Sequence, residues 1–362
     1  MRRTLLHSEL LHCNGSGCFR SPRSFERCLL AASVLSSFWF LTASLGLRRS
    51  ARAVPTRAVL PLKEWRFATY EFDNAKLGSL RRSAPLAQVA AGLSPSVIIK
   101  GFLKPEECAA VLKHSAEIQS QQGYTFLGAS AHQHFLAPYA ATDKYFAELV
   151  PASMRLWNET LGADFIPHLQ RAIGLLTKDK IVRSAVNRLH SYNPVVVRFH
   201  GPGAGFQVHY DSIRAYLFDE KKEQCGIRSK TAELANSKET EMHTYSTLLS
   251  GILVLQTPVS KRASTDTTMY DLSEHEVLSF NCETFERLQD ATHHQIGVNI
   301  PSLHSLLEEV PRSTPELHQG DLFIFNSNKV HVVNQVVGQQ ARVTLGFFLS
   351  YDKRQRDILM WA

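Results

Sequence analysis

The chain has 362 residues, of which 44% are hydrophobic, and a formal net charge of +7. That charge lies in residues 1–60, which hold nine arginines and two acidic residues, whereas the rest of the chain is neutral overall. Because a nucleic-acid groove needs basic side chains on the folded domain, this distribution excludes nucleic acid as a partner.

The basic N-terminal segment, residues 1–60, contains an uncharged run at residues 28–47. As a helix this run would span about 30 Å, which is the thickness of a bilayer core. We therefore predict a membrane protein with a single span through residues 28–47. The alternative is a cleaved targeting segment, because the residues that end at Ala53 resemble a small-x-small cleavage site. Cleavage near Ala53 would place the mature protein in the lumen of the secretory pathway or in an organelle.

Residues 61–189 are predicted to be a helical lead-in that packs on the outside of a β core. Residues 97–99 are typical of a short strand, and Pro105 followed by two glutamates is typical of a helix start. Apolar residues at helical spacing between residues 145 and 161 predict a further helix, which Pro151 breaks or restarts.

Residues 190–352 have the pattern of a β domain. A β-branched run at residues 195–197 leads through a Gly/Pro-rich turn into an extended segment that carries His209 and Asp211. Residues i and i+2 of a strand point to the same face, so an imidazole and a carboxylate are expected to project side by side.

Further strands and loops follow in the same region. An apolar strand is predicted at residues 247–255. The polar segment before it, at about residues 219–243, is expected to be a mobile surface loop, and a second polar stretch follows at about residues 257–275. Another strand is predicted at residues 322–325, after a Gly-Asp pair.

The chemistry of the region is indicated by five residues. His331 follows these strands, and Arg342 and Thr344 share one face of the next strand. Two histidines and one carboxylate (His209, Asp211 and His331) are the ligand set of non-haem iron sites, which keep metal positions open. Arg342 offers a fork of donors suited to a carboxylate. The six cysteines show no Cys-x-x-Cys pair, and we predict neither a zinc site nor a disulfide framework.

Taken in order, these motifs resemble the core of the Fe(II)/2-oxoglutarate-dependent dioxygenases, and most closely the prolyl 4-hydroxylase-like branch. The resemblance implies an α+β fold with a double-stranded β-helix, or jelly-roll, core and flanking N-terminal helices. Residues 281–285 resemble the family's Gly-Gly-Glu-Thr-x-Phe motif, with Asn-Cys in place of Gly-Gly. A plain turn is the alternative for this segment.

The resemblance also implies the cofactors. Fe(II) would be held by His209, Asp211 and His331, with 2-oxoglutarate and O₂ as cosubstrates. Arg342 and Thr344 match the family's Arg-x-Ser pair, which binds the distal carboxylate of 2-oxoglutarate.

Two positions at which the family commonly has a tyrosine or another aromatic residue are Phe199 and Phe206 here, so Tyr192 is predicted to help bind 2-oxoglutarate. L-ascorbate is predicted to support the enzyme by re-reducing the iron. The other histidines of the region are assigned to satisfied core or surface positions: His190, His200, His293, His294, His304 and His318.

The predicted function is therefore oxidation of a C–H bond in a protein side chain, with proline favoured, and release of succinate and CO₂. One alternative is a jelly-roll binding module without catalysis, and another is a hydroxylase of a small molecule or lipid. Formation of succinate separates the enzymes from the binding module. Substrate specificity is expected to reside in the loops near residues 212–243 and 257–295.

Overall fold

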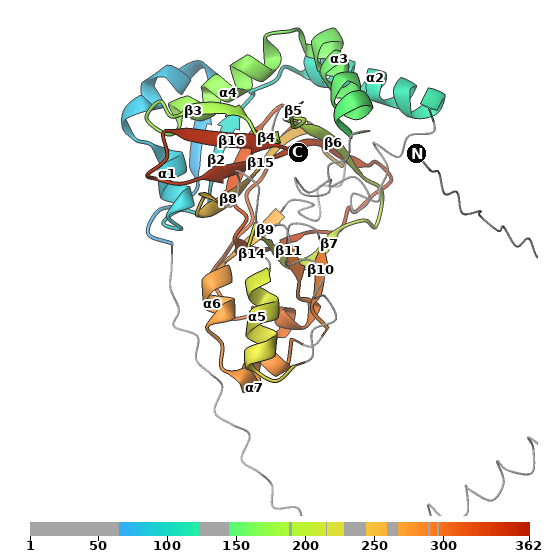
Figure 1. The fold of residues 1–362 in the computed structure, drawn as a ribbon. Helices are drawn as coiled ribbons and strands as arrows, with labels where there is room; N and C mark the ends of the chain where they lie inside the picture. Colours follow the sequence, from blue (N-terminus) through green and yellow to red (C-terminus); the bar gives the residue numbers. More distant parts are fainter. Residues whose placement is uncertain are drawn as a thin grey trace, which may run out of the picture. The chain divides into compact units, whose positions relative to one another are not determined.

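The computed structural model describes residues 65–122, 145–187, 190–214, 216–227, 244–258, 267–288, 290–294 and 297–362. In this part of the chain, helices accompany two large β-sheets, so the prediction of a fold that mixes α and β elements is confirmed. Figure 1 shows the two sheets one above the other, with helices on the outer side of each.

The first sheet has eight strands in the order β1-β2-β13-β8-β15-β16-β3, with β6 paired to β15. Its strands are β1 (Tyr70–Asp73), β2 (Ser96–Lys100), β3 (Ile181–Ser184), β6 (Val196–His200), β8 (Thr247–Gln256), β13 (Leu322–Asn326), β15 (Arg342–Tyr351) and β16 (Asp357–Trp361). The strands predicted at residues 97–99, 247–255 and 322–325 are all confirmed. β15 is central, because it pairs with β8 on one side and with β6 and then β16 on the other.

The second sheet has six strands in the order β10-β11-β7-β14-β9-β12. They are β7 (Phe206–Asp211), β9 (Thr267–Ser273), β10 (Thr292–His294), β11 (Gly297–Asn299), β12 (Arg312–Ser313) and β14 (Lys329–Val333). β4 (Val186–Asn187) and β5 (His190–Ser191) form a separate pair. The region near residues 257–295, where loops were expected, contains β9, which is a buried strand despite its polar residues.

Four helices cover the outer face of the first sheet (Figure 1). They are α1 (Pro85–Ala90), α2 (Pro105–Gln122), α3 (Val150–Leu161) and α4 (Phe165–Leu175), with the 3-10 helix η1 (Asn74–Arg82) and the short π-helix η4 (Tyr145–Leu149) beside them. The helix start predicted at Pro105 is confirmed, and Pro151 lies in the first turn of α3. Alternate residues of β15, such as Leu345 and Phe347, pack with Trp157 of α3 in one buried cluster. Because successive side chains of a strand point to opposite faces, the remaining residues of β15 point toward the second sheet.

The lead-in predicted at residues 61–189 therefore supplies β1, β2 and β3 to the first sheet as well as the covering helices. The division of the chain into residues 1–60, 61–189 and 190–352 stays a prediction.

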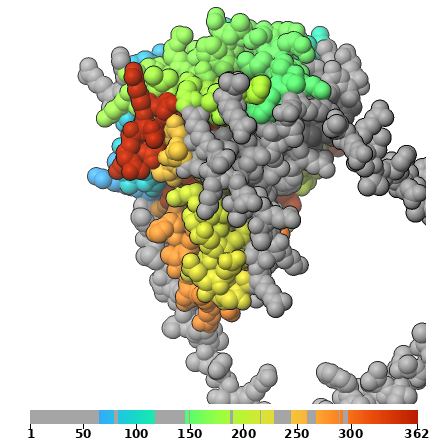
Figure 2. Space-filling model, viewed as in Figure 1, coloured from blue at the N-terminus to red at the C-terminus, as the bar shows by residue number. Residues whose placement is uncertain are grey.

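A small lobe lies on the outer side of the second sheet. It comprises α5 (Tyr216–Gln224), α6 (Glu274–Leu278), α7 (Cys282–Glu286) and the turn η7 (Pro301–Leu306). Phe218 of α5 and Phe285 of α7 are buried with Val208 and Tyr210 of β7. Figure 2 shows α5, in yellow, at the molecular surface beside the orange segments of this lobe. The lobe thus packs on the face of β7 that bears Val208 and Tyr210, and not on the face of its polar residues.

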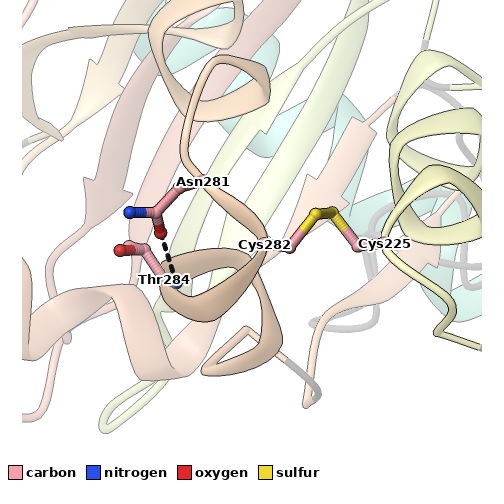
Figure 3. The surroundings of a disulfide bond; sticks show 4 residues. All are labelled: Cys225, Asn281, Cys282 and Thr284. Carbon is pink, nitrogen blue, oxygen red and sulfur yellow. Dashed lines mark hydrogen bonds between the residues drawn. A yellow bond between two sulfur atoms is a disulfide. The ribbon is translucent and has the colours of Figure 1, made fainter.

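A disulfide between Cys225 and Cys282 joins α5 to α7 across 57 residues of sequence (Figure 3). Beside it, the Oδ1 atom of Asn281 accepts a hydrogen bond from the backbone N–H of Thr284 at 2.8 Å and caps α7. Residues 281–285 are therefore a capped helix start and not a plain turn. The sequence analysis did not anticipate this disulfide, because only folding brings the two cysteines together.

The membrane prediction requires a correction. Throughout the part of the chain that the structure describes, no helix has the length and apolar character needed to cross a bilayer. The prediction of a single-pass membrane protein is withdrawn on this finding. Residues 28–47 and the cleavage position near Ala53 lie outside the described residues.

Gly320 provides a test of how β13 is positioned. Its φ is +88°, and a Cβ atom there would lie 2.2 Å from the backbone oxygen of Leu103. Gly101 has a φ of +61° but open space around it. We expect Gly101→Ala to lower the free energy of unfolding by about 1–2 kcal/mol, the cost of the left-handed conformation alone. Gly320→Ala should cost clearly more, because the backbone of Leu103 must also move.

Chemical denaturation of the two variants measures this difference. Equal losses of stability would mean that the contact between Gly320 and Leu103 has no energetic role.

Candidate metal centre and anion pocket

His209, Asp211 and His331 lie together on the face of the second sheet that looks toward the first sheet. His209 and Asp211 are two residues apart on β7, so both point to this face. β14 pairs with β7 so that His331 stands directly opposite His209. The register of one strand pair thus joins residues that are more than a hundred positions apart.

The three side chains have the geometry of a metal site. Their ligand atoms all lie within 4.8 Å of one another. The two imidazole rings have centroids 4.1 Å apart, and Nε2 of His331 is 3.7 Å from Oδ2 of Asp211. Each residue is at most 7% exposed. Among the residues that the structure describes, no other trio of His, Cys, Asp or Glu side chains is arranged to hold a metal ion.

Backbone carbonyls fix the orientation of both imidazoles. Nδ1 of His209 lies 2.6 Å from the oxygen of Gln207, and Nδ1 of His331 lies 2.9 Å from the oxygen of Lys329. A carbonyl oxygen can only accept, so each Nδ1 must carry the proton. Each neutral ring then leaves Nε2 with a lone pair, which is the form of histidine that binds metals.

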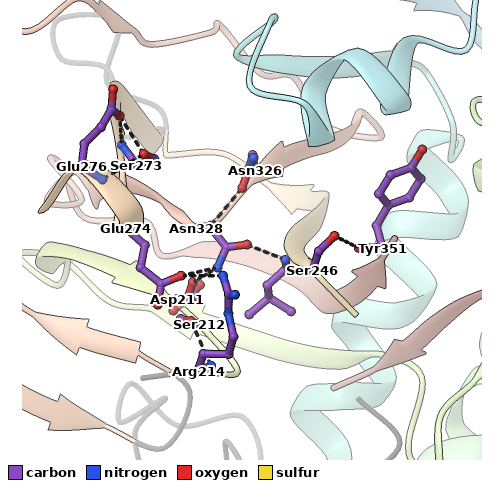
Figure 4. A network of polar contacts seen from close by, with 11 residues as sticks. Asp211, Ser212, Arg214, Ser246, Ser273, Glu274, Glu276, Asn326, Asn328 and Tyr351 are labelled. Atoms are coloured by element: carbon purple, nitrogen blue, oxygen red, sulfur yellow. Dashed lines mark hydrogen bonds and ion pairs between the residues drawn. The ribbon is translucent and has the colours of Figure 1, made fainter. Parts of the chain in front are cut away.

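Asp211 is held by contacts from both sheets. Its Oδ2 accepts a hydrogen bond from Oγ of Ser250 on β8 at 3.4 Å. Its backbone N–H donates to the oxygen of Ser327 at 2.8 Å. Nδ2 of Asn328 donates to the carbonyl of Asp211 at 3.0 Å, and Oδ1 of Asn328 accepts from the backbone N–H of Leu248 at 2.6 Å. Figure 4 shows Asn328 between Asp211 and the start of β8. The turn between β13 and β14 therefore fixes the carboxylate against both sheets.

The environment of Asp211 favours a bound cation. Burial raises the pKa of this carboxyl to about 7, although the charge of Arg198 and the hydrogen bond from Ser250 act in the opposite direction. A carboxyl with a raised pKa stabilises the metal-free fold most at low pH, and that contribution is lost as the pH rises toward 7. A metal ion at the site would offset the cost of ionising Asp211.

A group of buried basic residues on the first sheet lies near the metal centre. Arg342 and Thr344 of β15 are buried and stand opposite His200 and Arg198 of β6. Directly opposite residues of a strand pair project to the same face, so all four side chains look toward the second sheet. The predicted residues Arg342 and Thr344 are thus brought together.

Arg198 has room because β15 has a glycine beside it. A Cβ atom on Gly346 would lie 2.4 Å from Nε of Arg198. The guanidinium carbon of Arg198 also lies 5.5 Å from the ring centroid of Phe348. Burial lowers the pKa of Arg198 to about 10, the charge of Asp211 raises it and that of Arg342 lowers it. Arg198 therefore stays charged at neutral pH, between the carboxylate of the metal centre and the second arginine.

Tyr192 lies in a different buried cluster. Its ring centroid is 5.3 Å from that of Phe146 and 6.1 Å from that of Tyr145, and the same cluster includes Phe348. A role for Tyr192 in binding 2-oxoglutarate stays a prediction.

The sequence analysis missed Arg198, Ser250 and Asn328, and it assigned His200 to a satisfied core or surface position. The signal for Arg198 and His200 was present, because the pattern of β6 alternates. Val197 and Phe199 pack toward the helices, while Arg198 and His200 point the other way. Ser250 and Asn328 carried no local signal.

Comparison with known proteins gives a family match over part of the chain. Residues 263–362 match the family model of the carrier-protein-independent halogenase WelO5. This stretch includes β9, β14 and β15, and hence His331, Arg342 and Thr344, but not His209 and Asp211. No curated protein matches the chain.

Similar solved structures include three oxygenases or related enzymes. An N-substituted L-amino acid dioxygenase from Burkholderia ambifaria AMMD is 14% identical, with a TM-score of 0.45 over 77% of this chain and 91% of that one. The non-haem α-ketoglutarate-dependent epimerase SnoN is 14% identical, with a TM-score of 0.39 over 78% and 87%. A Pseudomonas putida prolyl-4-hydroxylase is 14% identical, with a TM-score of 0.32 over 75% and 97%.

The prediction of an enzyme, an oxidoreductase, is confirmed at this level by the family match and the clustered triad. The prolyl 4-hydroxylase-like branch is not confirmed.

Metal affinity should depend on pH through Asp211. Below a pH of about 7 the metal-free carboxyl carries a proton that must leave before the metal binds. We expect Mn²⁺ to bind about tenfold more weakly for each pH unit below 7 on account of this proton. Calorimetric titrations between pH 6 and 8, in two buffers of different ionisation enthalpy, measure both the affinity and the released proton.

The matched variant for that titration is Asp211→Asn. It should bind Mn²⁺ more weakly and release about one proton fewer. A wild-type affinity that does not change between pH 6 and 8 would contradict the raised pKa of Asp211.

Proposed function

We propose that the chain is an Fe(II)- and 2-oxoglutarate-dependent oxygenase that hydroxylates a C–H bond of its substrate. In this proposal His209, Asp211 and His331 are the iron ligands. The observation that carries it is the buried triad, in which Nε2 of both histidines and the carboxyl group of Asp211 converge on one point. Two imidazoles and one carboxylate suit iron and leave positions open for cosubstrates. Bound iron would supply the activation of O₂, coupled to the conversion of 2-oxoglutarate into succinate and CO₂.

The fold assigned with this function is the jelly-roll, or double-stranded β-helix. Its support is that the two sheets face each other and that the chain passes repeatedly between them, from β6 to β7 to β8 to β9 and from β13 to β14 to β15. This exchange of strands lets side chains of both sheets meet at one site, as Asp211 and Ser250 do.

The chain's own residues would hold and orient 2-oxoglutarate. Arg342 is the proposed partner of its distal carboxylate, with Thr344 on the same face two residues on. Arg342 and Arg198 bring two positive charges into the space between the sheets, where Asp211 supplies the negative charge nearest to Arg198. A dicarboxylate would complement these two positive charges. The apolar clusters under α1 to α4 on one side and in the lobe on the other would limit the access of water from these two faces.

Hydroxylation is favoured over halogenation because Asp211 occupies a ligand position. If iron binds here, Asp211 would take a ligand position that a halide would otherwise need, so the residues present would favour hydroxylation. The family match to a halogenase does not extend to the strand that carries Asp211.

For the substrate, we propose a small molecule, one of the alternatives from the sequence analysis. The matched family is named for an enzyme that is independent of a carrier protein, which favours a free substrate. A prolyl or other protein side chain is the competing proposal. L-ascorbate as a supporting reductant also remains a proposal.

Turnover of 2-oxoglutarate tests the function. The purified chain with Fe(II), 2-oxoglutarate and O₂ should form succinate, and His331→Ala should reduce this to background. The matched control is His318→Ala, because the side chain of His318 is 64% exposed.

A second experiment separates hydroxylation from halogenation. When the reaction is run under ¹⁸O₂ with chloride present, the product should contain ¹⁸O and no chlorine. Absence of succinate with every tested amino acid, peptide and metabolite would favour the non-catalytic binding module.

Arg342→Lys tests the cosubstrate anchor. Lysine keeps the charge but loses the two-pronged donor, so we expect the KM for 2-oxoglutarate to rise about 10- to 100-fold. Metal affinity should change little. The control is the same substitution at Arg354, whose side chain is exposed and pairs with Asp352. If the KM for 2-oxoglutarate is unchanged in Arg342→Lys, another residue binds that carboxylate.

A further inference from the structure

His200 is a buried histidine that the metal centre does not use. It is the last residue of β6, it stands directly opposite Arg342, and it is 5% exposed. Among the residues that the structure describes, neither Nδ1 nor Nε2 of His200 has a hydrogen-bond partner. Its one ring contact there is with Phe206, edge to face, at a centroid distance of 5.5 Å.

A buried polar group without a partner is destabilising, so its persistence calls for an explanation. The charges nearest to His200 cannot supply the missing acceptor. Burial and the positive charges of Arg342 and Arg198 lower the pKa of His200 to about 3, so the ring is neutral at physiological pH. A neutral imidazole carries one N–H donor and one acceptor nitrogen, and guanidinium groups only donate. The N–H of His200 therefore finds no acceptor on either of the two arginines.

We propose that His200 is a further binding residue, whose imidazole N–H donates to the distal carboxylate of 2-oxoglutarate beside Arg342. This inference rests on the proposed function, and it names a residue of the same pocket. A carboxylate has about four lone-pair sites, so it can accept from Arg342 and from His200 together. The negative charge of the ligand would also balance the positive charges of Arg198 and Arg342. In the free protein these charges help to keep the imidazole of His200 neutral.

The competing explanation is that His200 only fills space against Phe206. The two explanations predict opposite effects of His200→Phe. Phenylalanine keeps an aromatic ring and removes the unpartnered nitrogens, so it should leave the thermal stability of the ligand-free protein equal or higher. If His200 binds the carboxylate, the same variant should lose affinity for 2-oxoglutarate.

The experiment is calorimetric titration of the Mn²⁺-loaded protein, without turnover, with two ligands. 2-Oxoglutarate has the distal carboxylate, whereas 2-oxobutyrate has the same 2-oxo acid end and lacks that carboxylate. We expect His200→Phe to weaken 2-oxoglutarate binding about tenfold or more and to leave 2-oxobutyrate binding unchanged. His200→Gln, which keeps a donor, should recover part of the affinity. The matched control is Phe199→Leu, on the same strand but packed on the other face, which should change stability and neither affinity.

The outcomes separate the two proposals. If wild-type protein binds Mn²⁺ but not 2-oxoglutarate, the proposed function fails and this inference fails with it. If wild-type protein binds 2-oxoglutarate and His200→Phe binds it equally well, only the role of His200 is overturned. An equal loss for both ligands in His200→Phe also overturns it, because the effect would then not involve the distal carboxylate.

Discussion

The pairing of β7 with β14 is the interaction on which the site depends. It sets His331 opposite His209, and the pleat of β7 then brings Asp211 to the same face. A shift of β14 by one residue would turn His331 toward the lobe and Val330 or Val332 toward the first sheet. The hydrophobic contacts of Val330, on the lobe side, therefore also fix the ligand geometry on the inner side.

The space between the sheets is unusual for a protein interior because it holds many charges. Asp271 and Lys329 pair with each other there, while Asp211 lies between a histidine and a serine. Arg198 and Arg342 contribute positive charge from the first sheet. Burying these groups is costly unless each is compensated, and that cost is offset by rigid apolar packing on the two outer faces. The result is a pre-organised polar site in a protein interior that would be apolar if stability were the only requirement.

β9 illustrates why polar sequence and surface position are different properties. Neither face of this strand is consistently apolar, so its sequence predicts a loop. One face carries Thr267, Met269 and Asp271, and the other carries Thr268, Tyr270 and Leu272. In the fold every one of these residues is buried. Lys329 of β14 satisfies Asp271, and Tyr270 packs in the lobe. Such a strand can be recognised only when its partners are known, because the partners supply the opposite charge and the hydrogen bonds.

By itself the sequence determined the elements with strong local signals. The strands around Ile98 and Leu253 and the helix start at Pro105 follow from periodicity and capping, and the spacing of His209, Asp211, His331 and Arg342 indicated the chemistry. Tertiary structure decided what depends on contacts distant in sequence. It joined Cys225 to Cys282, it brought Asn328 and Ser250 to Asp211, and it set His200 opposite Arg342. The physical reason is that the burial and the pairing of a side chain depend on the neighbours that it acquires on folding. Those neighbours are distant in sequence, so the local sequence does not identify them.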